Sequence, residues 1–225
     1  VIITGGIIFE DQYFQRIQNT IESLKNQGCK IIGVASDPLN IKKVDIGNVR
    51  ASRMITEYLI NNGHHNIACV RGPEIMNATR MRFNGFKEAL KNNNIDINED
   101  LIISGDFSFE GGRRAASKLI DSIEKFSAVV TANDECALGF IWEMQKNGIE
   151  IPEDVSVVGI GNIERAKYSN PPLTTIHLPL YEIGKSIADH IIDGKKLNPG
   201  RYKEMIRIIE RESVLDKNKF ANVSG

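Results

Sequence analysis

Short runs of β-branched and aliphatic residues alternate along the chain with longer stretches in which apolar residues recur every three or four positions. The short runs predict strands, and the longer stretches predict amphipathic helices that bury one face. Strand and helix follow one another along nearly the whole chain, which is typical of βα units and a parallel sheet. The pattern therefore predicts an α/β protein of two similar lobes, with mostly parallel sheets flanked by helices.

The predicted elements are separated by short polar joints. Helices are expected over residues 11–27, 48–62, 79–92, 108–123, 134–147 and 181–193. Strands are expected over residues 1–3, 30–35, 66–70, 101–104, 128–132, 155–160, 174–178 and 205–210. Because the first strand begins with no cap or turn before it, we expect the fold to begin before residue 1. The polar residues 216–225 are expected to form a poorly ordered tail.

Composition and charge narrow the possible partners. The chain has 225 residues, of which 41% are hydrophobic, which is enough for a sizeable core. Its 28 Lys and Arg nearly balance 29 Asp and Glu, so the net charge is −1. No overall field attracts nucleic acid or an anionic membrane, and we expect this chain alone to bind DNA poorly.

The sequence carries no sign of a membrane span or a secretory leader. No apolar run is long enough to cross a bilayer, and the first residues lack a charged n-region. The three cysteines, Cys29, Cys69 and Cys136, are widely spaced and odd in number, which favours reduced, structural thiols. These features predict a cytoplasmic protein with no membrane partner.

Motifs of common catalytic and metal sites are missing. The sequence has no GxSxG, GxxxxGK[ST], HExxH or GxGxxG motif. His64 and His65 are adjacent, so on an extended backbone they point to opposite faces, and we interpret them as a structural or surface pair. We therefore predict no catalytic residue, no metal and no cofactor.

Polar and aromatic residues follow four predicted strands at the point where each strand ends. Open α/β sheets bind ligands at this edge. Guanidinium and amide groups donate directional hydrogen bonds, and an aromatic ring offers a flat apolar face. A cap, a turn or a surface charge is an equally good interpretation of each residue alone, and Asp134 is well placed as a helix N-cap. The candidate ligand-binding residues are Arg80, Arg82, Phe107, Asn133 and Asn162.

Seven segments together carry a family resemblance. They are YLINNGHHNIA at 58–68, RFNGF at 82–86, AND at 132–134, ALG at 137–139, IPEDVSVVG at 151–159, PPLTTI at 171–176 and RES at 211–213. In order and spacing they resemble the effector-binding core of the lactose-repressor/galactose-repressor (LacI/GalR) family of bacterial transcription regulators. That core has a type I periplasmic-binding-protein fold.

The resemblance implies two lobes joined by crossovers, with a small effector in the cleft between them. The N-side lobe would comprise residues 1–45 and 178–205, and the C-side lobe residues 46–177 and 206–215, followed by the tail 216–225. In the family, further βα units precede the strand that matches residues 1–3, so the N-side lobe is expected to be truncated by roughly sixty residues.

The resemblance also implies a mechanism. In this family effector binding shifts the lobes within a homodimer, and the shift repositions operator-binding helix-turn-helix heads. Such a head is not part of this chain, so operator DNA is expected as a partner of a longer protein. The function implied is allosteric control of transcription by a small molecule.

The resemblance assigns roles to three of the candidate residues. Arg82 matches an arginine that bonds effector hydroxyls or a carboxylate, Asn133 matches an amide that does the same, and Phe107 matches a stacking aromatic residue. Many members carry an acidic residue where this chain has Gly161, and Gln where it has Leu178. A lost charge-assisted hydrogen bond is worth about 1.5–3 kcal/mol, so the effector, a sugar or related metabolite, is left open.

Two alternatives remain open from the sequence. The same fold serves extracytoplasmic solute receptors and sensor modules of signalling proteins. An α/β enzyme would use Arg82 and Asp106 on a phosphorylated or carboxylated substrate.

Overall fold

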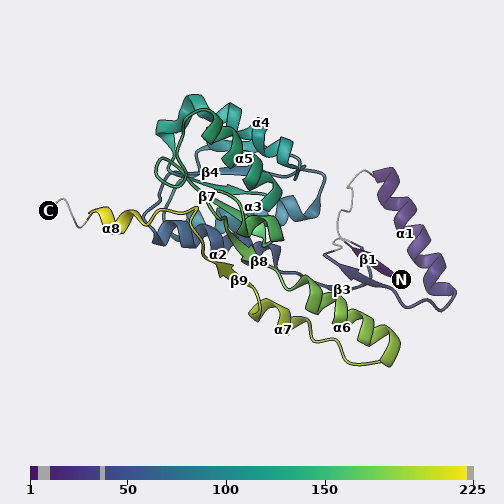
Figure 1. The fold of residues 1–225 in the computed structure, drawn as a ribbon. Coiled ribbons are helices and arrows are strands. Elements are labelled where there is room, and N and C mark those ends of the chain that lie inside the picture. Colours follow the sequence, from purple (N-terminus) through teal and green to yellow (C-terminus); the bar gives the residue numbers. More distant parts are fainter. Residues whose placement is uncertain (5–10, 36–38, 222–225) are drawn as a thin grey trace.

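The computed structural model describes residues 1–4, 11–35 and 39–221, which form an α/β fold with two sheets (Figure 1). The strands are β1 (Ile2–Thr4), β2 (Ile32–Val34), β3 (Lys42–Val44), β4 (Ile67–Arg71), β5 (Ile102–Ser104), β6 (Ala128–Thr131), β7 (Ser156–Gly161), β8 (Thr174–His177) and β9 (Arg207–Ile209). The helices are α1 (Asp11–Asn26), α2 (Asn48–Asn61), α3 (Asn77–Asn92), α4 (Phe109–Leu119), α5 (Asp134–Lys146), α6 (Leu180–Asp193), α7 (Pro199–Glu204) and α8 (Lys217–Ala221). Short 3₁₀ helices are η1 (Glu99–Leu101), η2 (Ile120–Lys125) and η3 (Glu164–Lys167).

The larger sheet has the strand order β5-β4-β6-β7-β8-β9. Its strands are parallel except β9, which pairs antiparallel with β8. Alternate residues face opposite sides, so Ala68 and Val70 of β4 pack with α4 and α5, whereas Ile67 and Cys69 pack with α2 and α3. Burial on both faces explains why these strands read as continuous apolar runs.

The smaller sheet has the order β1-β2-β3 and is parallel throughout. On one face Ile32 and Val44 pack against Ile183 and Ile187 of α6. A separate apolar cluster contains Ile21 of α1, together with Ile31 just before β2 and Leu39 between β2 and β3. Figure 1 shows α1, β1, β3 and α6 together at one end of the molecule.

The chain passes between the two parts along three connections, between β3 and α2, between β8 and α6, and between α7 and β9. Both β3 and β8 end where the chain crosses to the other part, so the carboxyl ends of the two parallel sheets face one another. This edge of the larger sheet is the part of the fold that positions the candidate residues. The predicted lobe limits stay a prediction.

Two helix pairs cover the faces of the larger sheet at close range. A Cβ on Gly85 of α3 would meet the backbone carbonyl of Val49 in α2. Gly112 of α4 and Gly139 of α5 are equally close to the backbone of the opposite helix. Small residues at these positions let the helix backbones approach each other.

Some elements differ from the sequence prediction. The strand β3 and the helix α7 were not predicted, because β3 is short and polar, with only Val44 buried, and α7 spans six residues. The expectation of a disordered tail is wrong for residues 216–221, since α8 forms and the Lys217 amide donates to Asn62 O at 2.9 Å. Residues 222–225 lie outside the described part.

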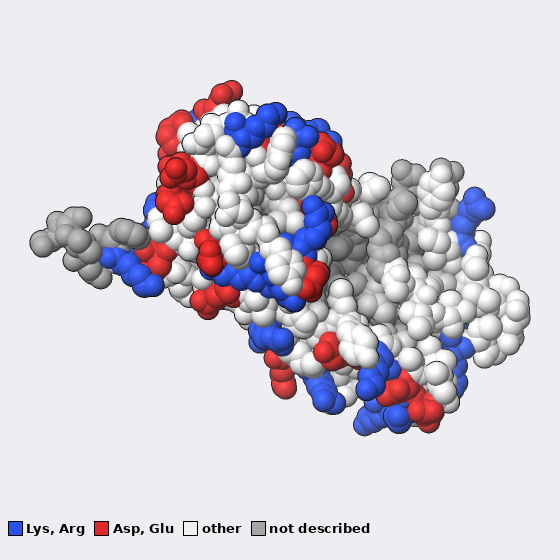
Figure 2. Space-filling view, in the orientation of Figure 1, with Lys and Arg blue, Asp and Glu red and all other residues white. Residues whose placement is uncertain are grey.

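Charge is mixed over the molecular surface. Figure 2 shows Lys, Arg, Asp and Glu side chains interspersed over the larger part of the molecule, with no field of one sign on the face in view. Within the described ranges, none of the helices has the length and apolar character that crossing a membrane requires.

Candidate functional site

Arg82 lies on α3 and is half-buried beside the carboxyl ends of β4 and β6. Its Nε donates to Asn48 Oδ1 at 2.9 Å, and its Nη1 donates to the carbonyl of Ala132. Burial lowers the pKa of Arg82 to about 10, and the nearby Asp134 carboxyl opposes this shift. Because both hydrogen-bond acceptors are neutral, neither of them neutralises the guanidinium charge.

Phe107 stands in the turn after β5 with φ of 65°, a left-handed conformation that is costly for an aromatic residue. Its ring packs directly over Gly72, where a Cβ would collide with it. The Arg82 guanidinium carbon lies 5.9 Å from the centre of the ring. Gly72 therefore allows Phe107 to fold back towards Arg82, and Phe107 and Arg82 border the same corner.

Asn133 caps the helix α5. Its Oδ1 accepts from the amide of Cys136 at 2.9 Å, and its Nδ2 donates to the carbonyl of Phe107 at 2.8 Å. The interpretation of Asp134 as the N-cap is wrong, because Asn133 has the extended backbone and the capping bond. Asn133 thus holds the Phe107 turn in place with the same amide group that was predicted to bind a ligand.

Asp134 is buried and ties three strand ends together. Its Oδ1 accepts from Thr175 Oγ1 at 2.5 Å, and its Oδ2 accepts from the amide of Ile163 at 2.8 Å. Burial raises the pKa of the Asp134 carboxyl, while the hydrogen bond from Thr175 lowers it. The carboxyl is therefore occupied by the protein on both oxygens.

Asn162 belongs to a second cluster, at the ends of β7 and β8. Arg211 Nη2 donates to its Oδ1 at 2.7 Å, and its Nδ2 lies 3.4 Å from His177 Nδ1. Burial and the charge of Arg207 lower the pKa of His177. The Asn162 side chain is thus engaged at the crossover into α6.

The structure brings three of the five candidates together, namely Arg82, Phe107 and Asn133. Asn162 follows β7, the strand next to the β6 strand that precedes Asn133, but its side chain bonds towards β8 and Arg211 and not towards Asn133. Arg80 is exposed and precedes Arg82 by two residues, a spacing that places the side chains on different faces of a helix. Their role in ligand binding stays a prediction.

Other polar residues at this edge were not selected from the sequence. Asn48 begins α2, Thr79 lies in the first turn of α3, and Arg211 follows β9. Their positions at this edge depend on tertiary contacts, and although Arg211 belongs to the segment RES at 211–213, no local pattern indicates that it lies beside Asn162. Arg71 could have been selected, because it is the last residue of β4; its guanidinium lies 4.2 Å from the Phe83 ring and pairs with Glu74 at 2.8 Å.

A small cavity of about 20 Å³ lies between the ends of β4 and β6 and the first turns of α2 and α3. This volume accommodates about one water molecule or one oxygen atom of a ligand. The cavity is lined by Ser52, Cys69, Val70, Arg71, Gly72, Thr79, Arg82, Phe83, Val130, Thr131, Ala132 and Ile160.

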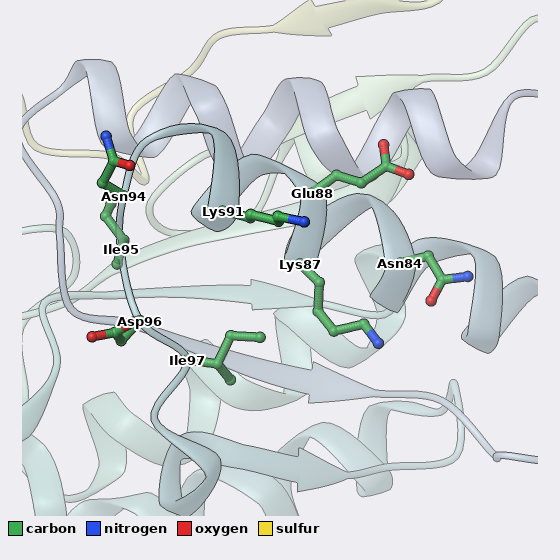
Figure 3. A pocket seen from close by; sticks show the side chains of 8 residues that line it. All are labelled: Asn84, Lys87, Glu88, Lys91, Asn94, Ile95, Asp96 and Ile97. Atoms are coloured by element: carbon green, nitrogen blue, oxygen red, sulfur yellow. The ribbon is translucent and has the colours of Figure 1, made fainter.

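A larger groove lies on the outside of the molecule. It has a volume of about 760 Å³ and is lined by residues of α3 and of the segment that follows it (Figure 3). Lys87 and Lys91 alternate there with Glu88 and Asp96, and none of the candidate residues lines it. The groove is therefore separate from the strand-end site.

His64, Cys69 and Cys136 are buried and have structural surroundings. His64 is buried and bonds to Ser127 Oγ at 2.9 Å and to Leu215 O at 3.0 Å. Burial raises the pKa of both Cys69 and Cys136 to about 12. Among the described residues no group of three or more His, Cys, Asp or Glu side chains is arranged to hold a metal.

Comparison with known proteins gives a family and several relatives. The periplasmic binding protein-like domain family matches residues 56–214 of this chain. The HTH-type transcriptional repressor PurR of Vibrio cholerae serotype O1 (strain M66-2) is 32% identical over 220 residues, which cover 96% of this chain and 66% of that protein. The HTH-type transcriptional repressor CytR of Escherichia coli (strain K12) is 36% identical over 155 residues, covering 69% of this chain and 46% of that protein.

A solved structure of a LacI-family regulator has the same fold as this chain. A sugar-binding transcriptional regulator of the LacI family from Escherichia coli, complexed with phosphate, superimposes with a TM-score of 0.77 at 26% identity. The match covers 88% of this chain and 73% of that chain. The present chain spans 66% and 46% of the lengths of the two curated relatives.

Proposed function

Because the chain belongs to the periplasmic binding protein-like family and shares its fold with regulators of the LacI family, we propose that it is the effector-binding domain of a transcriptional regulator. In this proposal a small molecule binds between the two lobes and shifts the equilibrium between two arrangements of the lobes. The longer protein would convert that change into a change of affinity for operator DNA.

One observation supports this function most directly. Arg82, Phe107 and Asn133 come from three different elements and meet at the carboxyl edge of the larger sheet, which faces the smaller one. A guanidinium beside an aromatic face at this edge suits a small polar ligand with a planar or ring-shaped body. We propose a sugar or a related metabolite, in keeping with the sugar-binding regulator that shares the fold.

Binding is a better proposal than catalysis. The enzyme alternative would use Asp106, but this carboxyl accepts from Ser108 Oγ and from Arg114. The hydrogen bond from Ser108 is the main cause that lowers the pKa of Asp106. A carboxylate that stays ionised and engaged by its neighbours is a weak general base. The relatives named above are repressors, which also favours a cytoplasmic regulator over an extracytoplasmic receptor.

The whole protein is proposed to bind operator DNA through a helix-turn-helix head outside this chain. Both curated relatives are named as HTH-type repressors. The present chain carries a net charge of −1 and a mixed surface, so the phosphate contacts would come from elsewhere.

We also propose a homodimer and place its contact on an exposed aromatic face. We define this face by Phe109 of α4, Trp142 of α5 and Tyr168 after η3, which line a groove of about 410 Å³. Trp142 is 44% exposed and Tyr168 is 78% exposed. Large exposed aromatic side chains grouped on one surface are typical of protein interfaces.

The effector proposal is tested with Arg82→Ala and Arg82→Lys. A thermal-shift screen of sugars, sugar phosphates and purines on the wild-type chain identifies ligands by the stability they add. For each hit, calorimetry is expected to show loss of binding in Arg82→Ala and partial retention in Arg82→Lys, which keeps the charge but not the fork geometry.

Arg50→Gln, on the exposed side of α2, is the matched control for loss of a positive charge. Circular dichroism checks that each variant folds, since Arg82 also bonds to Asn48 and Ala132. Unchanged affinity in a folded Arg82→Ala variant would remove Arg82 from the site, and a chain that binds none of the ligand classes would refute the proposed function.

A further inference from the structure

Three buried polar atoms at the strand-end site have no hydrogen-bond partner among the described residues. They are Arg71 Nε, Thr79 Oγ1 and Asn48 Nδ2. Thr79 is 2% exposed and Asn48 is 0% exposed, so bulk water does not compensate for the missing partners. A buried donor without a partner destabilises the fold, because it has lost its hydrogen bonds to water and gained none in return. Such a group calls for a bound molecule that supplies an acceptor.

Two of these atoms belong to residues that line one cavity. Arg71, Thr79 and Arg82 all line the small cavity of about 20 Å³ described above. Asn48 lies one turn before Ser52, another lining residue, and bonds to Arg82 through its Oδ1. Because that oxygen accepts from Arg82, the Asn48 Nδ2 is fixed as the unsatisfied end.

The space next to Thr79 depends on Gly72. A Cβ at this position would lie within 2.6 Å of Thr79 Oγ1 and would also collide with the Phe107 ring. The absence of a side chain on Gly72 therefore leaves space between the buried Thr79 hydroxyl and the aromatic ring. This arrangement places the unpartnered hydroxyl next to the proposed effector position.

Two guanidinium groups, those of Arg71 and Arg82, line the cavity, and its lining residues include no carboxylate. Arg82 donates to two neutral oxygens, Asn48 Oδ1 and Ala132 O. Arg71 pairs with Glu74, whose side chain is 68% exposed and is screened by water. The buried carboxylate of Asp134 is engaged by Thr175 and by the Ile163 amide.

We propose that the effector carries an anionic group, a phosphate or a carboxylate, and that one of its oxygens binds between Arg71, Thr79 and Arg82. This inference rests on the proposed function and names the chemical class of its ligand. An anionic oxygen accepts several hydrogen bonds at once and offsets the guanidinium charge. A neutral hydroxyl or a single water molecule would satisfy some of the donors but would leave the charge.

The test measures binding of inorganic phosphate and of acetate to the full 225-residue chain by calorimetry at low ionic strength. The two anions separate a phosphate site from a carboxylate site, and ribose serves as the neutral comparison. Thr79→Val removes the hydroxyl and keeps the shape, and Arg71→Gln removes the charge. The matched controls are Thr20→Val on the exposed side of α1 and Arg50→Gln on α2.

One of the two anions is expected to bind with a single site, whereas ribose alone binds more weakly. Thr79→Val and Arg71→Gln are each expected to reduce that affinity by about tenfold or more, because hydrogen bonds to charged groups are worth about 1.5–3 kcal/mol. The two controls are expected to bind the anion as the wild type does.

Absence of binding for both anions would overturn the inference, as would affinities that neither Thr79→Val nor Arg71→Gln changes. These failures differ from failure of the proposed function. If neutral sugars or purines bind and depend on Arg82 while both anions do not bind, the effector-binding function stands and the anionic class is wrong.

Discussion

Asp134 shows how a single buried carboxyl controls the geometry of the site. It accepts hydrogen bonds from Thr175 on β8 and from Ile163 in the turn after β7, and it begins α5 directly after the cap Asn133. Asp134 therefore fixes the position of the turn that carries Asn162 relative to Asn133, whose side chain holds the Phe107 turn. Its effect on ligand binding would be exerted through these neighbours.

The variant Asp134→Asn is expected to change the pH dependence of stability. Burial raises the pKa of the Asp134 carboxyl above 3.8. In the pH interval between 3.8 and this raised pKa, the folded state therefore binds more protons than the unfolded chain does. Stability of the wild type then falls as pH rises through this interval, whereas Asn does not titrate. The variant loses an acceptor, which costs about 1–3 kcal/mol of unfolding free energy, and this deficit is expected to narrow as the pH rises from about 4 through the raised pKa of the wild-type carboxyl.

Urea denaturation at several pH values measures this difference. A deficit that widens as the pH rises would mean that the hydrogen bonds from Thr175 and Ile163 outweigh burial and hold the carboxyl ionised. Thr175→Val removes the hydroxyl that bonds to Asp134 Oδ1, and it therefore tests how far this hydrogen bond opposes the effect of burial on the Asp134 pKa.

At the residue scale the sequence could predict which strand ends carry polar groups but not how those groups are used. Arg82 and Phe107 lie close to one another, since parallel strands place their carboxyl ends at one edge, but their role in binding stays a prediction. The partner of Arg82, Asn48, lies 34 positions away, and the partner of Asn162, Arg211, lies 49 positions away. No local pattern links residues at such separations, so the hydrogen bonds could not be predicted.

The packing of α2 against α3 depends on one glycine. Gly85→Ala would place a Cβ against the Val49 carbonyl and the Arg53 amide, both of them backbone atoms that cannot move alone. We expect this variant to lose about 1–3 kcal/mol of unfolding free energy, as overpacked cores do. Gly184→Ala on α6 has no atom within 4 Å of its Cβ and is the matched control.

Gly184→Ala is expected to gain roughly 0.5–1 kcal/mol of unfolding free energy, because alanine restricts the unfolded chain and favours the helix. Urea midpoints of the two variants and the wild type give the comparison. A Gly85→Ala variant as stable as Gly184→Ala would show that the two helices separate at little cost.

His64 links the C-terminal segment to the larger sheet. Its ring lies between Ser127 before β6, Ser156 at the start of β7 and the carbonyl of Leu215, which precedes α8. Burial, with smaller contributions from Lys217 and His65, lowers the pKa of His64 below 6.5, while Leu215 O and Asp216 raise it. The unfolded chain therefore binds a proton more readily than the folded state does.

The stability that neutral His64 contributes is fully present above about pH 6.5 and is lost as the pH falls through its lowered pKa. The hydrogen-exchange protection factors of residues 214–219, which are corrected for the pH dependence of intrinsic exchange, are expected to fall on acidification in the wild type and to depend less on pH in His64→Gln. His65→Gln, at the exposed neighbouring position, is expected to behave as the wild type does. Equal acid sensitivity of all three proteins would exclude His64 as the cause.

At the element scale, the length and periodicity of a segment decided whether it could be predicted. The long amphipathic helices α2, α3 and α5 agree with prediction to within two residues at each end. The strand β3 has one buried residue, and α8 is stabilised by the Lys217 amide and by Asn218 Nδ2, which donates to Asn61 O at 2.8 Å. Such elements form through tertiary contacts, and their sequences alone favour loops.

The whole molecule has its candidate site at an edge where two sheets face one another. The α/β class could be predicted, because strands buried on both faces give a distinctive apolar pattern. In the proposed function the effector lies between the two parts, because Arg82 and Phe107 belong to the larger one and the chain crosses to the smaller one after β8, at the same edge. Movement between the parts would therefore change the site, as an allosteric domain requires.

The proposed dimer is expected to form through the aromatic face of Phe109, Trp142 and Tyr168. Sedimentation equilibrium is expected to show a concentration-dependent dimer for the wild type. Tyr168→Glu is expected to weaken it by about tenfold or more, because a charge buried at an interface without a partner is costly. Tyr181→Glu on α6 is the matched control, since Tyr181 is 79% exposed and Tyr168 is 78% exposed. A dimer that Tyr181→Glu disrupts and Tyr168→Glu leaves intact would move the interface to α6, and a wild type that stays monomeric would refute the dimer for this chain.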